Sequence, residues 1–162
     1  MFAWIVRLLN RSAGKIAQQY LSDVRTEEGE RIVNDISIVG SNHFRDEVTE
    51  SIHLLKNKYP FGYSLLQRYI SSIVAFSRPI DYGVVDGLCF EVPRANGSLA
   101  WHPNRFAALL IRKAILARLS KRDLCVFRNP QVQSVAWKAE LRCMKILGCH
   151  PDYVKQQKEY ME

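Results

Sequence analysis

Histidine and cysteine side chains are the usual means of metal binding or nucleophilic catalysis, and this chain of 162 residues has four of each. No two histidines are three or four positions apart, the spacing that would bring both to one face of a helix. Cys143, Cys149 and His150 are close together, but a C-x5-C-H arrangement matches no common zinc spacing. We therefore expect no bound metal and no other cofactor, and we assign no catalytic residue. The other members of the set are His43, His53, His102, Cys89 and Cys125.

Basic side chains form the second chemically distinctive group. The first sixty residues carry eight basic and eight acidic side chains, so the whole net charge of +7 comes from the fifteen basic and eight acidic ones of residues 61–162. Such an excess can attract phosphates or an acidic partner. The side chains predicted to contact an anion or a nucleic acid are Arg105, Arg118, Lys121, Arg122 and Arg128. Bases also need stacking aromatics between the cations, and this segment offers only Phe106 and Phe127.

Arg112 differs from these residues because it lies on an apolar surface. Residues 105–119 are predicted to form a helix that is apolar nearly all round, which is typical of a helix central to the core. On a helical wheel Arg112 falls about 20° from Arg105, with Leu109 and Leu116 about 40–60° away. An unpaired charge in such a place would be costly. We therefore expect a carboxylate partner, and Glu140 on the following helix is the candidate.

The same helix resembles the active-site helix of zincin metallopeptidases, in which an HExxH motif follows a few aliphatic residues. Its surroundings are similar to those in small bacterial zincins: a strand, helices, a β-hairpin that ends in an aromatic residue, the motif helix, and a further helix with small and acidic residues. Here the hairpin ends at Trp101, and the further helix contains Val135–Leu141. The resemblance covers roughly residues 36–160.

The motif itself is replaced. In a zincin, two histidines at i and i+4 bind zinc, and the glutamate between them activates water. This chain reads Arg112-Lys113-Ala114-Ile115-Leu116, so Arg112 and Leu116 stand for the histidines and Lys113 for the glutamate. Arginine and leucine offer no lone pair to a metal, and the general base has become a cation. The resemblance thus implies a metallopeptidase fold whose site has been lost, with a guanidinium where a zinc ion would lie.

The elements that position these residues predict the α+β class, with a small antiparallel sheet or hairpin packed by several helices around a zincin-like central helix. We expect a strand at 36–39, a helix from 44 to 59, and a second helix whose inward face runs to Phe76. A hairpin then spans 83–101 and turns at Asn96–Gly97, with Asn104 capping the central helix. Helices at 131–147, closed by Gly148, and after Pro151 complete the domain. The predicted organisation is an N-terminal helix over 1–26 and one zincin-like domain over 31–162.

The N-terminal helix carries its own apolar stripe. Residues at steps of three and four mark one face, which is typical of an amphipathic helix: Phe2, Ile5, Leu9, Ala13, Ile16, Tyr20 and Val24. We expect this stripe to pack on the domain or on a second copy of the chain rather than to contact a membrane surface through residues 1–24. Arg7 interrupts the first apolar run, so we predict no signal peptide and a cytoplasmic protein with reduced thiols.

The functional hypothesis that follows is a non-catalytic, zincin-like domain that acts by protein binding or regulation. One alternative is a nucleic-acid-binding protein that uses the basic segment 105–128. Another is a hydrolase with an unrecognised site, which the histidine and cysteine spacings support poorly.

Overall fold

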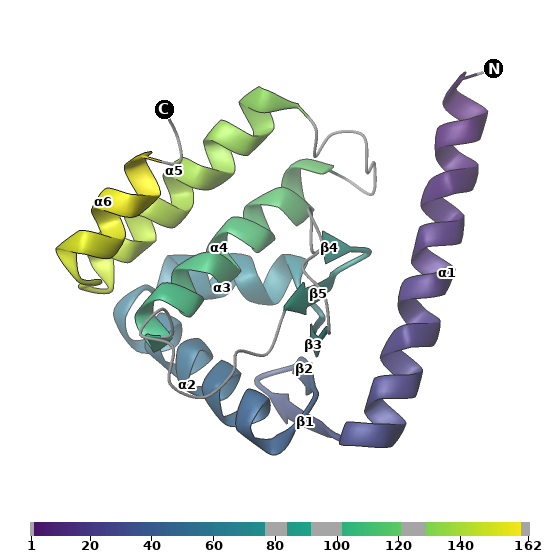
Figure 1. Cartoon of the computed structure of the whole chain (residues 1–162), viewed down its shortest axis with the longest axis horizontal. Helices are drawn as coiled ribbons and strands as arrows, with labels where there is room; N and C mark the ends of the chain where they lie inside the picture. Colours follow the sequence, from purple (N-terminus) through teal and green to yellow (C-terminus); the bar gives the residue numbers. More distant parts are fainter. Residues whose placement is uncertain (1, 77–83, 92–101, 121–128, 160–162) are drawn as a thin grey trace.

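The computed structural model describes residues 2–76, 84–91, 102–120 and 129–159, the side chains of residues 2–11 and 157 excepted. In these residues a five-stranded sheet has helices on both faces (Figure 1), and the predicted α+β class is confirmed. The helices are α1 (Phe2–Glu28), α2 (Asn42–Lys58), α3 (Pro60–Tyr69), α4 (Pro103–Ser120), α5 (Pro130–Ile146) and α6 (Pro151–Glu159). The strands are β1 (Glu30–Val33), β2 (Ile36–Val39), β3 (Ser72–Ala75), β4 (Val84–Val85) and β5 (Leu88–Glu91).

The sheet is mixed, not antiparallel throughout as predicted. Its strand order is β1-β2-β3-β5-β4, with antiparallel hairpins at both edges and parallel β2/β3 and β3/β5 pairs in the centre. Parallel neighbours need a crossover connection. Helices α2 and α3 supply that connection between β2 and β3.

Two strands were missed, and the first strand of the predicted hairpin is itself two strands, β4 and β5, joined by a tight turn. All four residues of β3 are buried, so they lack the alternation that marks a half-exposed strand, and the prediction absorbed them into the preceding helix. Strand β1 begins with the charged Glu30 and Arg31, and the prediction assigned no strand between the N-terminal helix over 1–26 and the strand at 36–39. The turn between β4 and β5 is Asp86–Gly87, with φ of 49° and 80°, the positive angles that tight hairpins require. Asn96–Gly97 lies outside the described residues.

The core has two parts, one on each face of the sheet. On one face of the sheet, α4 is the central helix (Figure 1). It packs against the strands, α2 and α3 on one side and against α5 on the other. Helix α4 is buried nearly all round, as its sequence predicts. On the other face α1 covers Val39, Val74, Leu88 and Phe90.

Helix α1 packs on the sheet through a face that overlaps the predicted stripe only in part. Val24 of that stripe is buried against the sheet beside Ala17 and Leu21, but Ile16 is 71% exposed. At about 100° per residue, Ile16 lies roughly 100° around the helix from the mean direction of those three residues. The sheet therefore contacts the face of α1 next to the one that Ile16 occupies. Tyr20 lies between the two faces and donates from its hydroxyl to the carbonyl of Ala75 at 3.1 Å.

Asn104 has a different role from the predicted cap. Helix α4 begins at Pro103, and the buried Asn104 side chain donates to the carbonyl of Leu147 at 2.7 Å. This bond ties the start of α4 to the end of α5. Gly148, with φ of 70°, follows that end as predicted, in the left-handed conformation that glycine adopts most readily.

Candidate functional site

Two consecutive cations of α4 enter the protein interior in different directions. Arg112 Nη1 lies 3.3 Å from Glu140 Oε2 on α5, the partner that the helical wheel predicts. Lys113 Nζ lies 3.5 Å from Glu91 Oε1 at the end of β5. Because successive helix positions point about 100° apart, the two pairs connect α4 to α5 on one side and to the sheet on the other.

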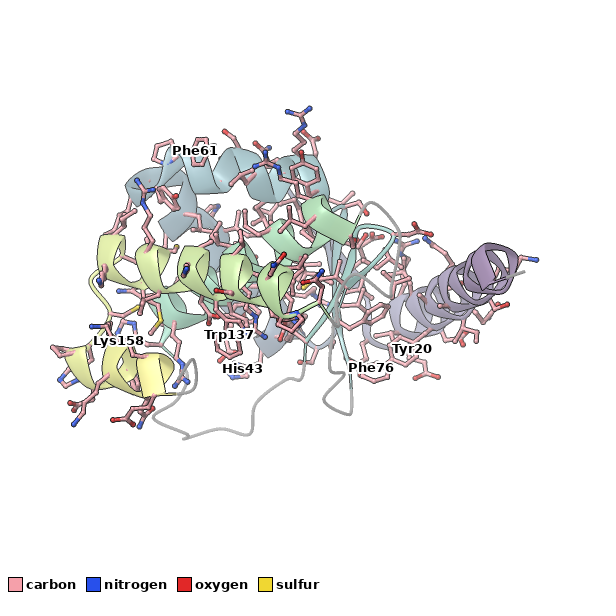
Figure 2. All side chains as sticks on the ribbon, turned by 90° about the horizontal axis from the view of Figure 1, so that it is seen from above. Tyr20, His43, Phe61, Phe76, Trp137 and Lys158 are labelled. Carbon is pink, nitrogen blue, oxygen red and sulfur yellow. The ribbon has the colours of Figure 1, made fainter. Side chains whose placement is uncertain are left out.

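The ion pair between Arg112 and Glu140 is largely shielded from water. The exposed fractions of the two side chains are 18% for Arg112 and 4% for Glu140. The Arg112 guanidinium carbon also lies 4.5 Å from the centre of the Trp137 ring, a cation–π distance. Trp137 (labelled in Figure 2) precedes Glu140 by three positions on α5, so both belong to one helix face. Within the described residues the buried Nε of Arg112 has no hydrogen-bond partner.

The Lys113 pair includes a thiol. The Lys113 side chain is 5% exposed and that of Glu91 is 12% exposed. Cys89 is two residues before Glu91 in β5, so both side chains lie on the same face of the strand. The Cys89 thiol donates to Glu91 Oε1 at 3.7 Å. Sequence reasoning missed this pair, although the signal was present: a helix apolar nearly all round must bury Lys113 too.

Burial and the two cations act in opposite directions on the carboxyl groups. Burial raises the pKa of Glu91, and Lys113 and then Arg112 oppose that rise. Burial also raises the pKa of Glu140, and the charges of Arg112 and, to a smaller extent, Arg105 lower it. Desolvation outweighs attraction at both sites, as is common for buried ion pairs. Each cation is therefore the largest influence that opposes the effect of burial on the pKa of its carboxyl partner.

The described cysteines are not activated as nucleophiles. Burial raises the pKa of Cys89 well above its usual value, that of Cys143 to about 12, and that of Cys149 to about 11. Reactive cysteines instead have a lowered pKa, because the thiolate is the attacking species. These three side chains have the environment of structural thiols.

The predicted anion-contacting residues do not form one exposed surface in the described part of the chain. Arg105 is half-buried, and its guanidinium carbon lies 5.2 Å from the centre of the Tyr153 ring. Arg118 is exposed near the end of α4. Lys121, Arg122 and Arg128 lie outside the described residues. Leu116, which the sequence resemblance would align with the second zincin histidine, is buried in the core.

All four histidines are exposed, two of them (His43 and His53) on α2 and the others just before α4 and α6. His43 Nε2 is 3.1 Å from Glu47 Oε1 within α2, and His150 Nδ1 is 3.4 Å from Asp152 Oδ2 at the start of α6. In the ranges that the structure describes, no three histidine, cysteine or acidic side chains are grouped so as to hold a metal ion.

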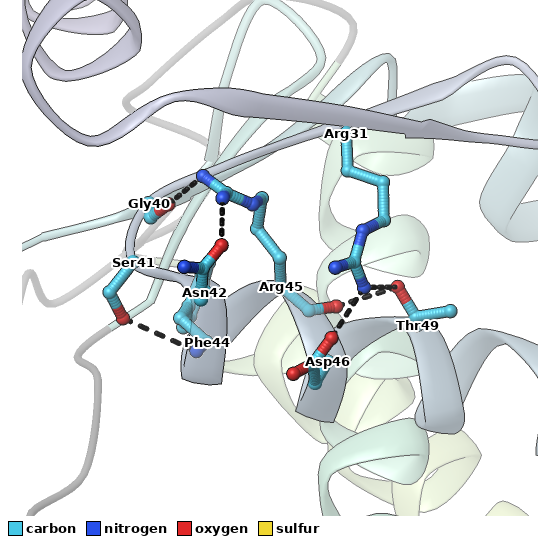
Figure 3. A network of polar contacts seen from close by, with 8 residues as sticks. All are labelled: Arg31, Gly40, Ser41, Asn42, Phe44, Arg45, Asp46 and Thr49. Carbon is cyan, nitrogen blue, oxygen red and sulfur yellow. Dashed lines mark hydrogen bonds and ion pairs between the residues drawn. The ribbon is translucent and has the colours of Figure 1, made fainter.

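A second polar cluster surrounds the start of α2 (Figure 3), and its contacts are those of a structural clamp. Arg45 Nη1 donates to the carbonyls of Glu28 at 2.6 Å and Gly40 at 2.5 Å, and its Nη2 donates to the Asn42 side chain. The guanidinium thereby joins the end of α1 to the turn between β2 and α2. Gly29, with φ of 92°, leaves room for it, since a Cβ there would lie 2.8 Å from Arg45 Nη1.

Beside this clamp, Arg31 Nη1 contacts Asp46 Oδ1 at 2.7 Å and donates to Thr49 Oγ1 at 3.4 Å (Figure 3). Arg31, Asp46 and Thr49 line one side of an open pocket on the outer face of α2, which His53 and Asn57 also line. Arg31 and Asp46 at its rim already pair with each other, and we assign the pocket no ligand.

Comparison of the chain with protein-family models, with curated proteins and with solved structures finds no match. In the described residues, no helix combines the length and the apolar character that crossing a membrane would require. The two buried ion pairs of α4 are therefore the most distinctive chemical feature of the described residues.

Proposed function

We propose that this chain is a non-catalytic domain with a zincin-like frame that acts by binding another protein. The observation that carries the proposal is the ion pair between Arg112 and Glu140. In a zincin-like frame Arg112 stands at the first histidine of the lost motif. A permanently protonated guanidinium at that position supplies positive charge without a metal.

Lys113, which stands for the catalytic glutamate of the zincin motif, supports the same proposal. A general base must accept a proton, whereas this buried ammonium is held against Glu91. Both cations neutralise carboxylates within the fold and fix α5 and the sheet onto α4. This role is structural, and it leaves the surface to perform the biological task.

Phe61 is the surface residue that we assign to the protein partner. It lies in the first turn of α3 and is 66% exposed, beside the partly buried Tyr59 with ring centres 6.2 Å apart. Figure 2 shows Phe61 at the outer edge of the molecule. Exposed aromatic side chains are enriched among the residues that dominate protein interfaces.

Zinc content tests the zincin-like frame. The purified chain should hold far less than one zinc ion per molecule and show no chelator-sensitive peptidase activity. The combined variant Arg112→His, Lys113→Glu, Leu116→His restores the two ligands and the base, so it should bind about one zinc ion. Adding Glu140→Ala should weaken that binding. Stoichiometric zinc in the unaltered chain, or a folded triple variant without zinc, would contradict the frame.

Partner capture tests the binding surface. Affinity purification of the Phe61→Ser variant, quantified by mass spectrometry, should lose partners that the unaltered chain retains by at least about tenfold, which corresponds to one aromatic anchor. Gln67→Ser is the matched control, because Gln67 is an exposed residue of the same helix. An identical set of partners for all three proteins would remove Phe61 from the proposal.

The alternatives have less support from the described residues. Nucleic-acid binding would need several accessible cations, and of the candidate contacts within the described residues Arg105 lies over the Tyr153 ring and Arg118 alone is exposed. A hydrolase with another site would need an activated group, and the described cysteines have raised pKa values.

A further inference from the structure

The outward surface of α5 carries cations between two exposed apolar side chains. At about 100° per residue its five exposed members fall within about 100° of one another, on the side away from the buried residues of the helix. They are Val135, Lys138, Arg142, Lys145 and Ile146. The acidic residue of α5, Glu140, is buried against Arg112, so this surface, the basic face of α5, has no carboxylate of its own.

The surface of α1 on which Ile16 lies has the opposite charge. Ile16, Asp23 and Glu27 are exposed and fall within about 40° of one another, and we call them the acidic face of α1. Ala17, Leu21 and Val24 hold the sheet from a direction about 100° away, so the acidic face is turned from the sheet. The ion pairs of the described residues include neither the two carboxylates of this face nor the three cations of the basic face.

The two faces are complementary when the helices run parallel to each other. Seven residues separate Ile16 from Asp23, and seven also separate Val135 from Arg142. In that register three pairs come level: Ile16 with Val135, Asp23 with Arg142, and Glu27 with Lys145. An antiparallel arrangement that sets Ile16 beside Ile146 brings Glu27 level with Val135 and leaves it without a cation. The parallel register therefore matches apolar to apolar and acidic to basic along both helices.

We propose that the acidic face of α1 binds the basic face of α5 on a second copy of the chain. The two helices lie at opposite edges of the molecule (Figure 1), so α1 does not reach α5 of its own copy. An anionic lipid surface or a nucleic acid would fit the basic face only, because Asp23 and Glu27 would repel it. A second copy covers both faces.

The contact joins copies head to tail. One copy contributes α1 and the next contributes α5, so the contact is heterologous and each copy keeps one free face for another. Docking leaves the fold intact, since the residues that hold α1 on its own sheet belong to neither face. Phe61 is on α3 and also belongs to neither face, so self-association is tested independently of the proposed function.

Zero-length carbodiimide cross-linking of the unaltered chain tests the contact directly. The reagent joins carboxylates to lysine amines that touch. In an equimolar mixture of isotopically light and heavy chains, mass spectrometry should find Asp23 or Glu27 linked to Lys138 or Lys145, with one peptide from each kind of chain. Absence of these mixed links at protein concentrations where the chain associates would overturn the proposal.

Charge reversal tests the same contact through the mass of the protein in solution. In sedimentation velocity, the average mass of the unaltered chain should rise with protein concentration and pass that of a dimer. The variants Asp23→Lys/Glu27→Lys and Lys138→Glu/Arg142→Glu should each stay monomeric. Their equimolar mixture should associate again, because the reversed face of one variant is complementary to the reversed face of the other. Both variants keep a net positive charge, so attraction between whole molecules would not explain that recovery.

Glu50→Lys/Glu159→Lys is the matched control, because it reverses two exposed carboxylates outside both faces and should associate like the unaltered chain. Circular dichroism verifies that each variant is folded, and the cross-linking result, which needs no variant, decides the matter for one that is not. Three results in solution would also overturn the proposal: a chain that is monomeric at every concentration, association that survives either reversal, or a mixture of the two folded variants that stays monomeric.

Discussion

Replacing Arg112 with alanine is expected to lower the free energy of unfolding by about 3–5 kcal/mol near neutral pH, the typical cost of removing one partner of a buried ion pair. The Glu140 side chain, only 4% exposed, would be left without the cation that most favours its ionised form. The contact with the Trp137 ring would be lost as well. Urea denaturation of the variant and the unaltered chain measures the difference.

The size of this effect should depend on pH. Burial already raises the pKa of Glu140 above its ordinary value of 4.5, and loss of Arg112 removes the largest opposing influence. A carboxyl whose pKa is raised in the folded state stabilises the fold at low pH, and that contribution is lost as the pH rises through the folded-state value. The stability gap should therefore be smaller at about pH 5 than at about pH 7.5.

Arg118→Ala is the control, because Arg118 is an exposed arginine of the same helix. Its effect should stay within about 0.5 kcal/mol, as for most surface substitutions. Equal and small effects at both positions would show that Arg112 is an ordinary surface residue. The proposed function would then lose the observation on which it rests.

The Arg112 pair could be predicted because helical periodicity alone decides which positions share a face. An arginine between two leucines on a core helix must find an acidic partner, and the next helix offers Glu140. The Lys113 pair escaped prediction because its partner is on a strand. Glu91 lies at the end of β5, and the sequence predicted one continuous strand here, whereas the chain turns at Asp86–Gly87 and starts a new strand at Leu88.

The sheet topology could not be predicted for a related reason. The segment Ser72–Ala75 is short and fully buried, so its pattern also fits the inner face of a helix. Its placement between β2 and β5 depends on tertiary pairing with both neighbours. Ile16 is a second example, because the sequence predicts the apolar stripe of α1 but not which part of the helix surface contacts the sheet.

Lys113→Met is expected to cost about as much as Arg112→Ala, about 3–5 kcal/mol, for the same reason. Methionine keeps the length and apolar stem of lysine but removes the charge. Glu91, whose side chain is 12% exposed, would remain beside the Cys89 thiol without the cation that most lowers its pKa. Lys145→Met, at an exposed position of α5, controls for the substitution itself.

A second substitution then separates a structural ion pair from a residue with another role. Because a buried pair can often be replaced by apolar side chains of similar volume without loss, adding Glu91→Leu to Lys113→Met should recover most of the stability. The double-mutant cycle should give a coupling energy at least as large as the stability that Glu91→Leu restores, because each single variant leaves a buried charge that the double variant removes. If the double variant is as unstable as Lys113→Met alone, contacts of Lys113 other than Glu91 hold α4 to the sheet. If both variants are stable but partner binding is lost, Lys113 contributes to the binding function and not only to the fold.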